Sequence, residues 1–146
     1  MSASFDEELR AEVRAPSLIR RRLRSWLTWQ EWPTEEIEDL LLAVSEAVSN
    51  SVEHAYPPDE PGSVRVRAEL QAEQQDRHRM VIVITDEGVW HDPSPEPVNR
   101  RRGIPMMRAT TAGLEVDGTD EGTWVRMVSR PVSVPASART TPLPVH

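Results

Sequence analysis

The sequence predicts an α/β (α+β) two-layer sandwich, in which helices cover one face of a mixed, mostly antiparallel sheet. Three observations support this prediction. Two amphipathic helical segments follow one another early in the 146-residue chain. The predicted strands come in consecutive pairs, which can form antiparallel hairpins. One strand, 80–85, is apolar on both faces, as a central strand is. The predicted order of elements is β-α-α-β-β-α-β-β.

The first third of the chain predicts one strand followed by two helices. Residues 5–13 alternate weakly between apolar and polar side chains, which favours a strand. A helix is expected from 16 to about 32, because the residue before Pro33 avoids helical geometry. Thr34 is a favourable N-cap for a second helix that ends near Ala55. The apolar stripe of this second helix consists of Ile37, Leu40, Leu41, Val44, Ala47 and Val48.

The remainder of the chain predicts four strands and one short helix. The segment 86–102 is polar, rich in proline and without periodicity, which is typical of a functional or disordered loop. We expect residues 1–130 to form one domain and the Pro/Ser/Thr-rich residues 131–146 to form a disordered tail. The expected elements are strands at 64–68, 80–85, 114–116 and 123–128, a helix at 104–112 and a turn at 117–122.

Composition excludes several classes of site. The chain has no cysteine, which removes disulfides, thiolate metal sites and cysteine nucleophiles. All 17 basic residues are arginine, so the lysines of Walker-type phosphate loops and of protein kinases are absent. The formal net charge of −7 disfavours direct binding to nucleic acid or to an anionic membrane. No segment has the roughly 20 apolar residues that span a bilayer, and the N-terminus lacks a secretion signal, so we expect a cytoplasmic protein.

Two segments of the central chain carry polar residues at chemically useful positions. Glu46, Asn50 and His54 lie about one helical turn apart and share a face. On spacing alone, this is most simply a solvated helix face. Asp86 and Gly88 directly follow the apolar strand. They form either an ordinary turn or a carboxylate that accepts from a ligand, with a glycine that allows close approach.

Two further segments are ambiguous in the same way. Arg102, Gly103 and Ile104 close the long loop and open the short helix. The amides at a helix start can bind an anion such as phosphate, but glycine there is also common punctuation. Gly122 and Thr123 begin the last strand and are a weak signal by themselves.

The order of these segments resembles the Bergerat-type ATP-binding domain of the GHKL superfamily. Residues 45–56, SEAVSNSVEHAY, look most like the anti-sigma-factor serine kinases of the RsbW and SpoIIAB group. The resemblance covers about residues 5–128. It implies that Asn50 holds Mg²⁺, that Glu46 is the general base, and that Asp86 accepts from the adenine amino group above Gly88. The nucleotide-binding residues that it implies are Asn50, His54, Asp86, Gly88, Arg102, Gly103, Ile104 and Thr123.

The resemblance also implies a function. The chain would use ATP and Mg²⁺, bind a sigma factor and phosphorylate a Ser/Thr of a STAS-type anti-anti-sigma antagonist. The resemblance also allows a homodimer. The alternative is a partner-switching module that sequesters a regulatory protein without catalysis. The alternative is motivated by Trp90 and Arg101, which occupy positions where the family often has glycine. A nucleic-acid binder using the arginines of 20–24 is a further rival, which the net charge opposes.

Overall fold

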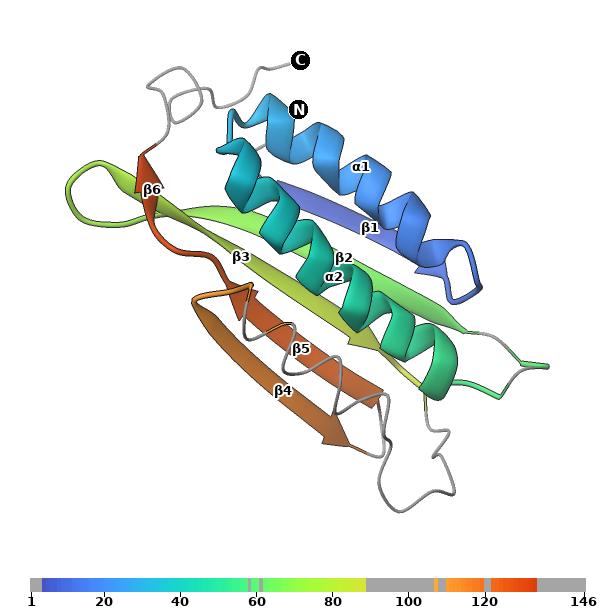
Figure 1. Cartoon of the computed structure of the whole chain (residues 1–146). Helices are drawn as coiled ribbons and strands as arrows, with labels where there is room; N and C mark the ends of the chain where they lie inside the picture. The colour runs from blue at the N-terminus through green and yellow to red at the C-terminus, as the bar shows by residue number, and fades with distance from the viewer. Residues whose placement is uncertain are drawn as a thin grey trace.

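One sheet and two helices make up the part of the chain that the structure, a computed structural model, describes: residues 4–57, 59–60, 62–88, 107, 110–119 and 122–133. Both helices lie on the same face of the sheet (Figure 1), which confirms the predicted two-layer sandwich. The elements are, in chain order, β1 (Ser4–Arg10), α1 (Ala15–Trp29), α2 (Thr34–His54), β2 (Ser63–Ala72), β3 (Arg77–Asp86), β4 (Gly113–Thr119), β5 (Gly122–Val128) and β6 (Val132–Ser133).

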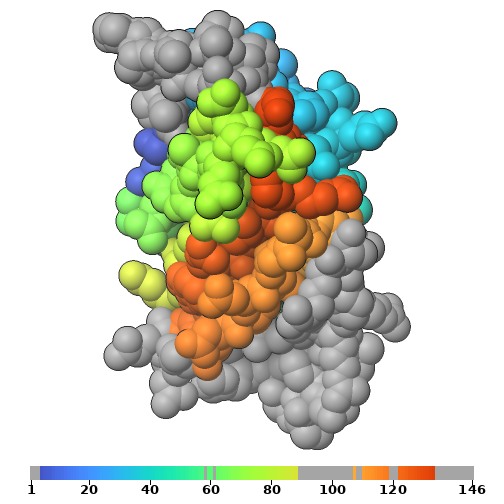
Figure 2. All heavy atoms as spheres, turned by 90° about the vertical axis from the view of Figure 1, so that its left-hand side faces the viewer, coloured from blue at the N-terminus to red at the C-terminus, as the bar shows by residue number. Residues whose placement is uncertain are grey.

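The sheet has the strand order β1-β2-β3-β5-β4, with β6 paired to the beginning of β3. All of the strand pairs within the described ranges are antiparallel. Strand β3 is therefore central, as its apolar sequence predicted. Figure 2 shows the side of the molecule where the β2–β3 hairpin lies above β5 and β4.

Several element boundaries differ from the sequence-based prediction. Strands β2 and β3 are longer than expected, because residues 71–72 and 77–79 continue the ladder and only residues 73–76 form the connection of the hairpin. Strand β4 extends to Thr119, which shortens the turn expected at 117–122. Strand β6 lies within the expected disordered tail, so that expectation is wrong for Val132 and Ser133, which pair with β3. Of the helix expected at 104–112, most lies outside the described residues.

The start of α2 also corrects the sequence analysis. Thr34 is the first residue of the helix and not its N-cap. Pro33 occupies the N-cap position, and no side-chain hydrogen bond caps the helix. The helix is nevertheless supported by Glu35 and Glu36 in its first turn, where negative charge interacts favourably with the helix dipole.

The core lies between the helices and the sheet. The predicted apolar stripe of α2 is buried against α1 on one side and against the sheet beneath. At the edge of the sheet, the rings of Phe5 and Trp26 lie 5.8 Å apart and join β1 to α1. The largest fully buried side chains include Ile19, Leu23, Leu27, Leu40, Leu41, Met80, Ile82, Ile84 and Met127.

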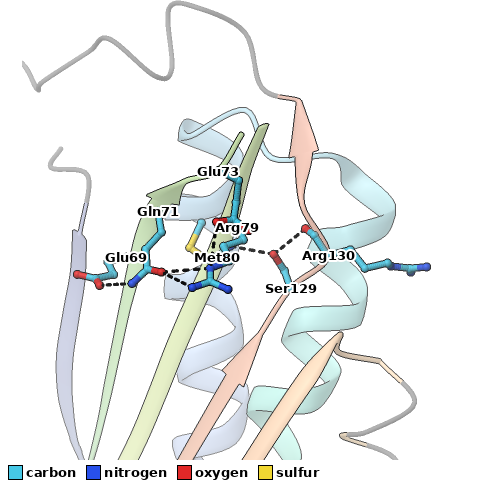
Figure 3. A network of polar contacts seen from close by, with 7 residues as sticks. All are labelled: Glu69, Gln71, Glu73, Arg79, Met80, Ser129 and Arg130. Carbon is cyan, nitrogen blue, oxygen red and sulfur yellow. Dashed lines mark hydrogen bonds and ion pairs between the residues drawn. The ribbon is translucent and has the colours of Figure 1, made fainter. Parts of the chain in front are cut away.

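The two ends of β3 are held differently. At its beginning, the hydroxyl of Ser129 accepts a 2.8 Å hydrogen bond from the Met80 amide and donates to the Arg130 carbonyl (Figure 3). Arg130 then pairs with Glu36 and Asp39 on α2. The other end of β3 lies beside the C-terminal end of α2 (Figure 1), and the candidate site residues gather there.

Candidate functional site

Asp86, the last residue of β3, is the centre of the candidate site. Its side chain is buried, with 6% of its surface exposed. Oδ1 accepts hydrogen bonds from the amides of Gly88, at 3.2 Å, and Thr123, at 3.1 Å. Oδ2 accepts a hydrogen bond from the hydroxyl of Ser51, at 2.6 Å. One carboxylate therefore joins α2, the turn after β3 and the start of β5.

These three donors determine what Asp86 can still bind. An ionised carboxylate has about four acceptor positions, two on each oxygen. The two amides fill those of Oδ1, and Ser51 fills one on Oδ2. The remaining position on Oδ2 can accept one N–H or O–H from a ligand. A ligand carbonyl at the same place would be repelled, because two acceptors would face each other.

Two glycines let the backbone close around Asp86. A Cβ at Gly88 would lie 2.0 Å from the carbonyl oxygen of Ala55, at the end of α2. Gly122 has a φ of +140°, and a Cβ there would lie 1.9 Å from the carbonyl oxygen of Asp86. Larger residues would push α2, β3 and β5 apart at these points. Both glycines are therefore required by close approach, and not only by a turn.

A small cavity lies between α2 and the β4–β5 hairpin, lined in part by Ser51 and Thr123, which both donate hydrogen bonds to Asp86. It has a volume of about 20 Å³, which is room for about one water molecule. Its polar walls come from Asn50, Ser51 and Thr123, and the others are largely apolar. A ring the size of a purine requires the cavity to widen. The lining residues within the described ranges are Ala47, Asn50, Ser51, Met107, Val116, Thr123 and Val125.

The polar face of α2 is only partly solvated. Asn50 is half-buried and lines the cavity. Glu46 is also half-buried, one turn toward the N-terminus on the same helix face. His54 is buried, with 8% exposure, and its Nε2 lies 3.6 Å from the carboxylate of Glu53. Among the described residues, His54 is not part of the cavity wall.

The structure thus brings Asn50, Asp86, Gly88 and Thr123 to one place. The predicted residues Arg102, Gly103 and Ile104 lie outside the described residues, as do Trp90 and Arg101. Within the described ranges, no group of three or more histidine, aspartate and glutamate side chains is arranged to hold a metal ion. No helix in the same ranges is long and apolar enough to cross a membrane.

Sequence reasoning missed two hydroxyl groups of the site. Ser51 donates to Asp86, and Tyr56 accepts from the Glu87 amide. Both belong to the helix motif at 45–56, but nothing in their spacing distinguishes them from ordinary helix and helix-end residues. Their partners lie 35 and 31 residues away in the sequence, so only the fold reveals these contacts.

Comparison with known proteins shows the family of this chain. A family model described as the histidine kinase-like ATPase domain matches residues 9–129. The match spans most of the chain, which therefore belongs to the histidine kinase-like ATPase domain family.

Individual relatives indicate which group within the family this chain resembles. The chain is 34% identical over 105 residues to an anti-sigma F factor of Clostridium beijerinckii, covering 64% of this chain and 69% of the relative. It is 37% identical over 71 residues to the serine-protein kinase RsbW of Bacillus subtilis, covering 49% of this chain and only 41% of that kinase. These relatives confirm the resemblance to the RsbW and SpoIIAB group.

A solved structure also matches. It contains the RsbU and RsbW domains of Rv1364c from Mycobacterium tuberculosis. The match has a TM-score of 0.65 and 25% sequence identity, and it covers 88% of this chain and 32% of the other.

Proposed function

We propose that this chain is an ATP-dependent anti-sigma regulatory kinase. It would bind a sigma factor and phosphorylate a serine or threonine of a STAS-type antagonist. The observation that carries the proposal is the buried Asp86 carboxylate, which has one acceptor position left. Its partners Ser51 and Thr123 line a small cavity together with Asn50. Membership of the histidine kinase-like ATPase domain family and the names of the relatives support it.

Adenine matches the remaining acceptor on Asp86. The exocyclic amino group of adenine is a donor, whereas the corresponding group of guanine or hypoxanthine is a carbonyl acceptor. Gly88 donates its amide to Asp86 Oδ1, and the partly exposed Thr123 lines the cavity from β5. We propose that these three residues select the base.

The phosphates and their metal would lie toward Asn50. A neutral amide oxygen suits Mg²⁺, which binds oxygen ligands and usually receives several of them from phosphates and water. Asn50 fits this role because it is half-buried and faces the cavity next to the proposed base site. Bound Mg²⁺ would offset the negative charge of the phosphates during transfer. Arg102, Gly103 and Ile104 stay predicted phosphate neighbours, and His54 a predicted nucleotide-site residue.

Glu46 is the proposed general base. It lies one turn from Asn50 and is partly exposed, so a hydroxyl of another protein can reach it. Its carboxylate would accept the proton of the Ser/Thr hydroxyl as that oxygen attacks the γ-phosphate. The products are ADP and the phosphorylated antagonist. Phosphorylation would weaken antagonist binding and leave the chain available to the sigma factor.

The proposed partners follow from this cycle. Sigma factor and antagonist would bind in a mutually exclusive way, in the cytoplasm, without direct contact of this chain with nucleic acid. A homodimer is compatible with the proposal and is tested separately by the mass of the protein in solution.

One experiment tests the proposal directly. The full chain is incubated with labelled ATP, Mg²⁺ and each STAS-type protein encoded in the same genome. We expect Mg²⁺-dependent transfer of the label to a serine or threonine of one of them. ATP binding without transfer to any of them would favour the non-catalytic partner-switching module instead. A chain that does not bind ATP would contradict the proposal.

A further inference from the structure

Tyr56 connects three segments at the edge of the candidate site. It lies two residues after the end of α2, and its hydroxyl accepts a 3.0 Å hydrogen bond from the amide of Glu87. The same hydroxyl donates a 2.6 Å hydrogen bond to the carbonyl of Ser63, the first residue of β2. Its ring lies against Gly62, where a Cβ would approach the ring to 2.2 Å. Tyr56 is thus anchored on the α2–β2 side and contacts the turn after β3.

The contacted turn is the one that contains Asp86 and Gly88. Asp86 Oδ1 accepts from the Gly88 amide two residues later, which closes an Asx turn. Glu87 lies between them, so its amide direction depends on the geometry of this turn. Two amides of the turn therefore have fixed partners: the Glu87 amide donates to the Tyr56 hydroxyl, and the Gly88 amide donates to the Asp86 carboxylate. Without Tyr56, the Glu87 amide could turn toward water.

The two hydrogen bonds require a neutral phenol. A phenolate could accept from Glu87, but it could not donate to Ser63. Burial raises the pKa of the Tyr56 phenol above its ordinary value, and the nearby Asp86 charge acts in the same direction. The hydroxyl is therefore protonated at neutral pH and can hold both partners.

We infer that Tyr56 is a positioning residue that sets the selectivity of this site for a 6-amino purine over a 6-oxo purine. It does so by fixing the Asp86–Gly88 turn, and hence the direction of the one free acceptor position on Asp86. The inference rests on the proposed function, because it assumes that Asp86 reads the base. Tyr56 itself does not touch the nucleotide.

The test is a comparison of ATP with inosine triphosphate, which differs at the 6-position of the base. Their dissociation constants are measured by calorimetry with Mg²⁺ for the wild type and for Tyr56→Phe, which keeps the ring. Losing one hydrogen bond to the turn should reduce the preference for ATP by about 3- to 10-fold. Affinity for inosine triphosphate should change by less than about 2-fold. If part of the variant is unfolded, both dissociation constants rise by the same factor and their ratio does not change.

Ser129→Ala is a matched control. The Ser129 hydroxyl also accepts from one backbone amide and donates to one backbone carbonyl (Figure 3). It acts on β3 at Met80, about 20 Å along the strand from Asp86 at roughly 3.3 Å per residue. This variant should leave the ratio of the two affinities at the wild-type value.

The outcomes separate this inference from the proposed function. A wild-type chain that prefers ATP, with an equal preference in Tyr56→Phe, overturns the positioning role alone. An equal fall in preference in Ser129→Ala also overturns it, because the effect would then be general destabilisation. A wild-type chain that binds neither nucleotide overturns the proposed function and this inference with it.

Discussion

The hydroxyl of Ser51 and Oδ2 of Asp86 form a buried hydrogen bond of 2.6 Å between residues 35 positions apart. It attaches the C-terminal part of α2 to the end of the central strand. Because Ser51 is a donor, it uses one acceptor position of Asp86 and leaves one for a ligand. This relationship defines both the position and the binding capacity of the candidate site.

Asp86→Asn should weaken ATP binding. The amide group keeps the shape of the carboxylate but replaces one acceptor oxygen with a donor, so either a protein donor or the adenine amino group loses its partner. We expect a loss of about 1–3 kcal/mol in binding free energy, measured by calorimetry with Mg²⁺. Equal affinity of the variant and the wild type would show that Asp86 does not read the base.

Glu46 and Asn50 should have separable roles. Asn50→Ala is expected to weaken Mg²⁺-dependent ATP binding and phosphoryl transfer together. Glu46→Gln keeps the shape and loses the base, so ATP affinity should persist while transfer to the antagonist falls by about 10²- to 10⁴-fold. Binding and transfer are measured on the same preparations. If both variants behave as the wild type, this helix face is only a solvated surface; a Glu46→Gln protein that no longer binds ATP would make Glu46 part of the binding site.

Gly88→Ala should destabilise the fold and abolish ATP binding. The new methyl group would lie 2.0 Å from the carbonyl oxygen of Ala55, a backbone atom that cannot move aside cheaply. Gly113→Ala is the matched control, because its nearest contact would be an ordinary 3.7 Å to Val128. Overpacking of this kind typically costs about 1–3 kcal/mol, so a lower midpoint of urea unfolding is expected for Gly88→Ala alone. The same midpoint in both variants would refute the close-approach argument.

Truncation should show that only the first part of the expected tail contributes to the free energy of unfolding. A chain ending at Ser133 keeps β6, which pairs with Arg77 and His78, and retains Val132 against the core. Its free energy of unfolding should equal that of the full chain, because the Pro/Ser/Thr-rich remainder has little to bury. A chain ending at Arg130 loses Val132 and should be less stable by about 1–2 kcal/mol in urea unfolding. Marked destabilisation of the chain ending at Ser133 would mean that the remainder is packed.

The sequence by itself predicted the layers of the fold. Helical spacing identified the buried stripe of α2, and the apolar run at 80–85 identified the central strand, because both signals are local and periodic. The length of the β2–β3 hairpin was not predictable in this way, since polar residues can continue a ladder wherever a partner strand is present. Strand β6 was missed because two residues carry no periodic signal.

The residues of the candidate site were likewise predicted in part from the sequence, while their contacts were decided by the structure. The order of its motifs in the sequence pointed to Glu46, Asn50, Asp86, Gly88 and Thr123, and the family comparison supports that resemblance. Only the tertiary structure decided that Ser51 and the amides of Gly88 and Thr123 fill three acceptor positions of Asp86, and that Tyr56 holds the turn beside it. These are hydrogen bonds of 2.6–3.2 Å, most of them between segments more than 30 residues apart. A sequence records which donors and acceptors exist, but which of them meet is determined by how the helix packs on the sheet.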